Sequence, residues 1–194
     1  MIDDLTHSQS DMRTAYCSGG AGILASGIAW LVAAIIAFRG APQQAVWALF
    51  IGGMLIHPAG VLICKLLGSP GVHAKANPLG SLAWASTFWL IFSLPLAYVA
   101  SLQRIEWFFP AMLLVIGGRY LVFSSLYGMR TYWFLGLLLA ATGFLLGRAM
   151  APPAMSACAG AAIEIVFGVA VLFMHRRWAR TNNAFAPAPI GGAA

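Results

Sequence analysis

The sequence has very little charge for its length. Only 8% of its 194 residues are Asp, Glu, Lys or Arg, whereas 61% are hydrophobic, and the mean hydropathy is +0.84. A soluble domain carries about 25% charged residues, because a surface exposed to water needs them. This composition therefore excludes a soluble globular protein and indicates a polytopic membrane protein.

Metal-binding residues are also scarce. The chain has three cysteines without a CxxC motif and four histidines that are scattered along it. A structural zinc site needs four Cys or His ligands at characteristic spacings, so we predict no metal site. We interpret Cys17, Cys64 and Cys158 as small packing residues. No cofactor is indicated either, because a single intramembrane histidine, His57, does not argue for haem.

Motifs of common enzymes and of nucleic-acid binding are missing as well. The sequence contains no HExxH, no GxSxG and no Gly-rich phosphate loop. The net charge of +6 is not gathered on a basic face or in an RNA-binding motif. We therefore predict no catalytic residues and no nucleic-acid partner, and we favour a role other than that of an enzyme, with a membrane-embedded enzyme as the third hypothesis.

Long apolar runs are what the sequence has in abundance. About 20 residues of helix, rising 1.5 Å each, cross about 30 Å of hydrocarbon. The runs predict an all-α fold, a transmembrane bundle of six helices over residues 15–174, after a polar tail (residues 1–14) and before a basic juxtamembrane segment and disordered tail (residues 175–194). The six predicted spans are 15–38, 44–67, 79–102, 107–128, 132–150 and 154–174.

The positions of Lys and Arg between the spans predict the orientation, because cytoplasmic loops are enriched in them. One side holds Arg13, Lys65, Lys75, Arg130, Arg176, Arg177 and Arg180, and the other holds Arg39, Arg104 and Arg148. We therefore expect a multi-pass protein of the bacterial cytoplasmic membrane, embedded in its lipid bilayer, with both termini in the cytoplasm.

Three ionisable residues interrupt the apolar runs: His57, Arg119 and Glu164. Counting along their helices gives depths of about 20, 18 and 15 Å, so all three lie near the midplane. A charge at that depth costs about 2.5–3.5 kcal/mol on insertion scales, and such residues usually face other helices or water. The common depth predicts an Arg119–Glu164 ion pair, with His57 as a third member of the cluster.

Glycines flank two of these residues about one turn away on either side: Gly160 and Gly168 around Glu164, and Gly53 and Gly60 around His57. Small residues let a neighbouring helix approach closely, so we expect both side chains to be buried between helices. Pro58 directly follows His57 and removes a backbone donor, which predicts a kink in the second span.

Two interpretations of this polar cluster stay open. In the first, His57, Arg119 and Glu164 line a site for a small ligand or a proton, as in a transporter, channel or receptor. In the second, the Arg119–Glu164 pair only fixes helix packing, and the protein has a structural or accessory role. Other small-residue stripes, Ser18–Gly22–Ser26 and Gly136–Ala140–Gly143–Gly147, predict helix–helix contacts, with a homo-oligomer as the alternative use of one stripe.

Three short segments carry a resemblance to a known family: Asn77–Gly80, Gly117–Leu121 and Ala162–Phe167. On these segments, residues 13–175 resemble an uncharacterised, domain-of-unknown-function family of small bacterial integral membrane proteins with six helices. The resemblance implies a fold and a membrane location but no activity or substrate. Because the segments include Arg119 and Glu164, it favours treating these two residues as a unit.

Overall fold

The computed structural model describes residues 2–184 and consists of helices joined by short connections. A polar helix, α1 (Ile2–Ala15), is followed by a short 3₁₀ turn, η1 (Cys17–Gly19). A second 3₁₀ turn, η2 (Ile105–Trp107), precedes α5. The longer helices are α2 (Gly20–Phe38), α3 (Pro42–Leu66), α4 (Leu79–Gln103), α5 (Phe108–Tyr127), α6 (Thr131–Arg148) and α7 (Pro153–Ala184).

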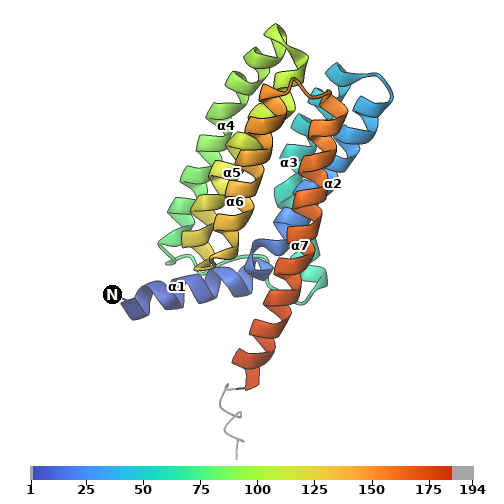
Figure 1. Cartoon of the computed structure of the whole chain (residues 1–194). Coiled ribbons are helices and arrows are strands. Elements are labelled where there is room, and N and C mark those ends of the chain that lie inside the picture. The colour runs from blue at the N-terminus through green and yellow to red at the C-terminus, as the bar shows by residue number, and fades with distance from the viewer. Residues whose placement is uncertain (1, 185–194) are drawn as a thin grey trace, which may run out of the picture.

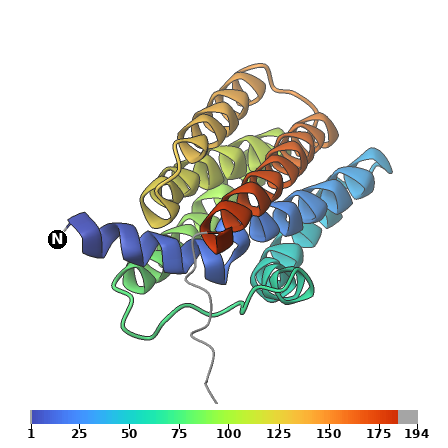
Figure 2. The ribbon, with the colours of Figure 1, turned by 90° about the horizontal axis from the view of Figure 1, so that it is seen from below.

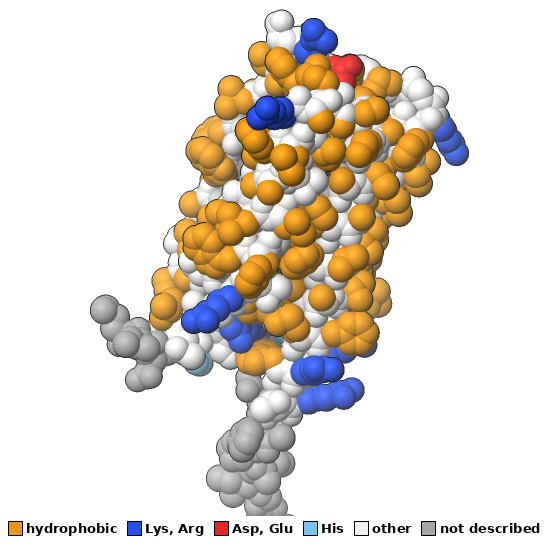
Figure 3. All heavy atoms as spheres, viewed as in Figure 1, with side chains coloured by type: hydrophobic (Ala, Val, Ile, Leu, Met, Phe, Trp, Pro, Cys, Tyr) orange, Lys and Arg blue, Asp and Glu red, His pale blue; other side chains and the backbone are white. Residues whose placement is uncertain are grey.

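The six predicted spans are confirmed by helices α2 to α7. Each is long and apolar enough to cross a membrane, from Cys17–Phe38 to Pro153–Thr181. Large apolar side chains cover the sides of the bundle, while Lys and Arg lie toward its two ends (Figure 3). A lipid bilayer would cover this apolar surface. The six long apolar helices and the exposed apolar side chains therefore show an integral membrane protein.

The spanning helices form two groups of three (Figures 1 and 2). In the α2/α3/α7 group, α2 packs extensively against both α3 and α7; in the α4/α5/α6 group, α5 packs against both α4 and α6. Contacts between the groups are fewer: α7 meets α5 and α6, and aromatic rings of α3 meet rings of α4 and α5. Residues on α5 and α7 that face each other therefore lie at the boundary between two tightly packed groups.

Glycines allow the close approaches inside each group. An added Cβ at Gly117 on α5 would lie 2.6 Å from the carbonyl oxygen of Gly136 on α6, and one at Gly136 would lie 2.6 Å from that of Gly117. A Cβ at Gly27 on α2 would lie 2.8 Å from the Ile165 side chain on α7. The predicted stripe on residues 136–147 is therefore a helix–helix contact within the chain, as small residues permit.

Helix α1 lies across one end of the bundle, an arrangement that the polarity of residues 1–14 did not indicate (Figures 1 and 2). Its Arg13 donates to the carbonyl oxygens of Tyr127 and Gly128 at 2.5 and 2.9 Å, and Gln9 donates to that of Ser125 at 2.8 Å. The last carbonyls of a helix have no partners of their own and carry partial negative charge. α1 supplies donors and a cation to the end of α5, which holds it against the bundle.

Asn77 makes polar contacts just before α4 begins. Asn77 Oδ1 accepts the backbone N–H of Leu79 at 3.0 Å, the contact of a helix cap. The Asn77 amide also donates to Asp11 Oδ2 on α1 at 2.7 Å. This loop therefore lies under α1, at what we call the α1 end of the bundle.

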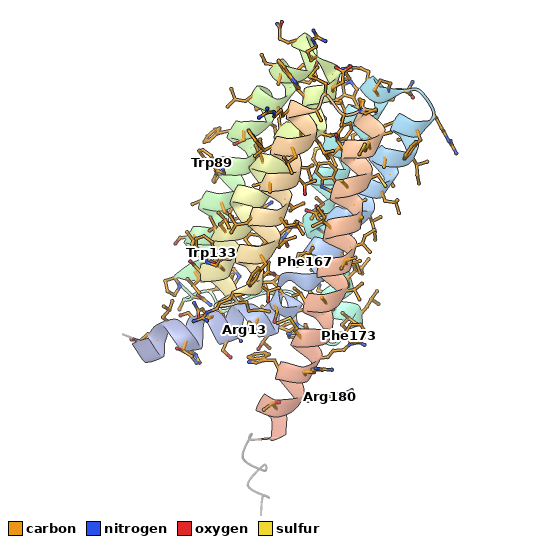
Figure 4. All side chains as sticks on the ribbon, in the orientation of Figure 1. Arg13, Trp89, Trp133, Phe167, Phe173 and Arg180 are labelled. Atoms are coloured by element: carbon orange, nitrogen blue, oxygen red, sulfur yellow. The ribbon has the colours of Figure 1, made fainter. Side chains whose placement is uncertain are left out.

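The last helix is longer than its apolar run. α7 continues to Ala184, beyond the predicted end of the span at residue 174 and into the first residues of the predicted disordered tail. For residues 181–184 the prediction of disorder is thus wrong, and residues 185–194 lie outside the described part of the chain. The helical extension carries Arg180 beyond the rest of the bundle (Figure 4).

Candidate functional site

Glu164 is the most deeply buried ionisable residue of the predicted cluster. It lies on α7 with 0% of its side chain exposed, at the boundary between the two helix groups. The hydroxyl of Tyr120 on α5 donates to Oε1 at 3.0 Å. Oε2 is buried and forms no hydrogen bond of good geometry with a described residue, although the Ser26 hydroxyl of α2 lies close to the carboxyl group. One half of the carboxyl group is therefore satisfied and the other half is not.

Arg119 is the residue before Tyr120, but its side chain makes its contacts elsewhere. A terminal nitrogen donates to Thr87 Oγ1 on α4 at 3.2 Å, and the guanidinium lies 5.3 Å from the centre of the Phe123 ring. Its Nε is buried without a partner within residues 2–184. A cation over an aromatic face is attracted by the ring, so Arg119 is held on the α4 side of α5.

The predicted direct pair between Arg119 and Glu164 is therefore not formed. Among the described residues, no hydrogen bond or ion pair joins their side chains, and Tyr120 makes the contact to the carboxylate instead. Arg119 and Glu164 nevertheless lie on helices that contact each other, α5 and α7. Two of the three predicted residues are thus brought to the same region, with a tyrosine as the link.

His57 does not join them. It is exposed on α3, as are Met54 and Pro58 beside it. α3 packs mainly on α2, and the close approach occurs at Gly60, where an added Cβ would lie 3.2 Å from Gly22 Cα. The expectation that His57 is buried between helices is wrong, because Gly53 has no neighbour within 4 Å of an added Cβ.

The glycines around Glu164, in contrast, lie where the sequence predicts close contacts. An added Cβ at Gly160 would lie 2.7 Å from the Trp30 ring of α2, and one at Gly168 would lie 2.8 Å from the backbone of Leu24. Such distances leave no room for a side chain at either position. α7 is therefore pressed against α2 above and below Glu164.

Three polar partners of the site were not predicted: Ser26, Thr87 and Tyr120. Ser26 had been assigned to a packing stripe, and Tyr120 adjoins Arg119 in the sequence. A tyrosine or threonine in a membrane helix is too common to be singled out on its own, and only the packing of α4 and α5 brings these hydroxyls to the charges.

Aromatic side chains fill the space between Glu164 and the α1 end. Tyr120, Phe123, Tyr127 and Tyr132 contact one another, with ring centroids 5.5–6.1 Å apart. Tyr132 also donates to the carbonyl oxygen of Ser18 at 2.6 Å, which ties α6 to the start of the first span. This aromatic cluster separates the carboxyl group from the α1 end.

Toward the opposite end, buried polar atoms without partners continue along the same face of α7. Ser156 lies two turns before Glu164 on that face, about 12 Å away along the helix. In the described structure, Ser156 Oγ and Trp30 Nε1 are both buried and have no hydrogen-bond partner. Buried polar groups are usually paired, so a run of unpaired ones needs an explanation.

The described residues hold no group of three or more His, Cys, Asp or Glu side chains placed to bind a metal ion.

A family model described as a family of unknown function, DUF7010, matches residues 5–175. The chain belongs to this family. Membership of DUF7010 confirms the resemblance to an uncharacterised family, and the match includes Tyr120, Glu164 and most of α1. No curated protein and no solved structure matches the chain.

Proposed function

We propose that this protein is a small membrane transporter in which Glu164 takes up and releases a proton between the two helix groups. The observation that carries the proposal is a fully buried carboxyl group with one oxygen bonded to Tyr120 and the other without a well-formed hydrogen bond to any described residue. Ionisable residues within membrane-spanning helices are rare, and they often belong to proton relays or ion pathways.

A proton is favoured over a larger ligand because the packing around Glu164 is close. Gly160 and Gly168 touch α2 on either side of it. Two surface hollows lie at the α1 end, one beside α1 and one beside the extension of α7. A proton needs no cavity, only a carboxyl oxygen that is free to carry it.

The residues around the carboxyl group suggest how proton uptake by Glu164 is coupled to a shift of the α4/α5/α6 group. Removing a positive charge from a buried carboxylate favours the protonated form, and bringing one closer favours the ionised form. Arg119 and Tyr120 lie on α5 and Glu164 on α7, so a shift of the α4/α5/α6 group changes both distances. Binding of one proton converts the carboxylate to a neutral acid, and its release restores the charge.

The unpaired atoms favour proton access from the end opposite α1. Ser156 and Trp30 lie on that side of Glu164, whereas the aromatic cluster of Tyr120, Phe123, Tyr127 and Tyr132 lies on the other. The Ser156 hydroxyl and the Trp30 indole N–H have no described partner and can bond to water, whereas the Tyr120 and Tyr132 hydroxyls already donate to Glu164 and to the Ser18 carbonyl oxygen. The described conformation is thus consistent with a carboxyl group accessible from one side of the membrane.

We assign the α1 end to the cytoplasmic side of a bacterial inner membrane. That end gathers Arg13 on α1, Arg130 in the α5–α6 loop, and Arg176, Arg177 and Arg180 on α7. The excess of Lys and Arg over the other end supports this orientation. Protons would then enter from the periplasmic side.

The test is proton flux into proteoliposomes that contain a pH-sensitive dye. An imposed pH gradient should decay faster with the wild-type protein than with empty liposomes, and Glu164→Gln should return the rate to that of empty liposomes. His57→Gln is the control, since it also replaces an ionisable residue with glutamine but at an exposed site, and it should keep the wild-type rate. Glu164→Asp, which keeps an acid, should retain part of the flux. A Glu164→Gln protein that conducts like the wild type would refute the proposal.

The structural role is the second candidate, and the close packing of Gly27, Gly160 and Gly168 favours it. In that case Glu164 holds α7 against α5 through Tyr120 and exchanges no proton. The wild-type protein would then conduct no protons, and Glu164→Gln would lower the melting temperature in detergent. An unchanged melting curve for that variant would refute this alternative.

A further inference from the structure

A hollow opens at the α1 end, between the end of α3 and the extension of α7. Its volume is about 270 Å³. Its lining combines apolar and cationic side chains: Leu67, Leu172, His175, Arg176, Ala179 and Arg180. No acid is among them, so the electrostatic field in the hollow is positive.

The two arginines are available for a ligand. Arg176 and Arg180 are exposed, and neither side chain has a hydrogen bond or an ion pair with the described residues. They lie four residues apart, so they project from the same side of α7. Guanidinium groups form paired, charge-assisted hydrogen bonds with phosphate oxygens.

The back of the hollow is anchored to the bundle. His175 Nδ1 and the Ser18 hydroxyl are hydrogen-bonded at 3.0 Å, which links this part of α7 to the start of the first span. His175 also contacts the Trp178 ring, with centroids 5.8 Å apart. The arginines are thus carried on a helix whose position is held at this level.

The hollow also lies where the apolar surface ends. The candidate span on α7 runs from Pro153 to Thr181 and therefore includes the arginines. Leu66 and Phe173, which adjoin the lining residues Leu67 and Leu172 in the sequence, also expose apolar side chains. A ligand here meets positive charge on the α1 side and hydrocarbon on the other, which is the arrangement of a phospholipid at the membrane interface.

We propose that this hollow binds one anionic phospholipid, with its phosphate between Arg176 and Arg180 and an acyl chain along Leu67 and Leu172. A lipid is favoured over free phosphate because a part of the lining is apolar and would gain nothing from an inorganic ion. Lys and Arg near a membrane surface attract anionic lipid more than zwitterionic lipid. The proposal is independent of proton transport.

The test compares two double variants that remove the same charge. Arg176→Gln/Arg180→Gln removes both arginines of the hollow, whereas Arg130→Gln/Arg177→Gln removes two from the same end outside it. The wild-type protein in neutral detergent is titrated with phosphatidylglycerol, and bound lipid is counted by native mass spectrometry. Phosphatidylcholine serves as the zwitterionic reference.

The first variant should bind phosphatidylglycerol about tenfold more weakly or worse, and the second should stay within about threefold of the wild type. An equal loss in both variants would overturn the proposal, because it would mean diffuse attraction to the whole end. Equal binding of phosphatidylcholine would overturn it too. Inorganic phosphate that displaces the lipid at comparable concentration would show that the hollow recognises the free ion instead.

Discussion

The α7 surface around Glu164 and the α3 surface around His57 look alike in the sequence and differ in the structure. Each has an ionisable residue near the midplane, with a glycine about one turn away on either side. Glu164 is fully buried, and its glycines touch α2. His57 is exposed, and Gly53 beside it touches nothing within 4 Å of an added Cβ.

The difference follows from the number of neighbours that each helix has. α7 packs against α2, α5 and α6, so several of its faces are covered around Glu164. α3 packs mainly on α2, and its ring contacts with α4 and α5 are made at Trp47 and Phe50, about two to three turns before His57. Glycine on a helix permits a close approach but does not supply the partner. A polar residue beside glycine is therefore buried only if a second helix is present on that side.

The largest expected effect on stability comes from adding a side chain at Gly160 of α7, with the same addition at Gly53 of α3 as the comparison. Gly160→Leu places a side chain where even a Cβ would lie 2.7 Å from the Trp30 ring, so it should destabilise the bundle by about 3 kcal/mol. Gly53→Leu adds the same atoms where there is open space and should change stability by less than about 0.5 kcal/mol. The measurement is the melting temperature in detergent.

Equal melting temperatures for the two leucine variants would mean that α7 does not approach α2 as described. The comparison between the two surfaces would then have no basis in packing. Gly160→Ala should lie between the wild type and Gly160→Leu, because its single added carbon meets the same ring.

A smaller effect is expected when the hydrogen bond between Tyr120 and Glu164 is removed. Tyr120→Phe removes the hydroxyl that donates to Oε1 and leaves both carboxylate oxygens unpaired. The loss of a partner by a buried polar group costs about 1–3 kcal/mol, and we expect about 2 kcal/mol here. Thermal or denaturant unfolding in detergent provides the measurement.

Tyr98→Phe is the matched control, since the same atom is removed from a partly buried tyrosine of α4 whose hydroxyl has no hydrogen bond to residues 2–184. It should leave stability within about 0.5 kcal/mol of the wild type. If Tyr98→Phe lowered the free energy of unfolding as much as Tyr120→Phe, the hydrogen bond between Tyr120 and Glu164 would not explain the loss of stability.

Most of the fold was predictable because membrane spans have a strong local signal. The apolar runs gave all six helices, and the predicted start of α4 at Leu79 agrees with the structure. α1 was not predicted as a helix, since its residues are polar and its attachment depends on Arg13 and Gln9 meeting the end of α5. A contact between residues more than 100 positions apart leaves no local pattern.

The site was predictable in depth but not in direction. Counting at 1.5 Å per residue predicts how far along the membrane normal each residue lies. Arg119 on α5 and Glu164 on α7 are at a similar level, since Tyr120, the residue after Arg119, bonds to Glu164. Which way a side chain points depends on how each helix is rotated, and this placed His57 outside and turned Arg119 toward Thr87. The hydroxyl of Tyr120 then took the place that the sequence had suggested for Arg119.

The smallest effect is expected at His57 itself. His57→Leu replaces an exposed side chain that has no contact with Arg119 or Glu164, on a face that apolar residues such as Met54 and Leu55 already share. Neither packing nor a hydrogen bond within the described chain is lost, so stability should stay within about 0.5 kcal/mol of the wild type or rise slightly in lipid. Melting curves in detergent and in lipid nanodiscs measure this. A loss of 2 kcal/mol or more would place His57 in a contact and remove the contrast with Glu164.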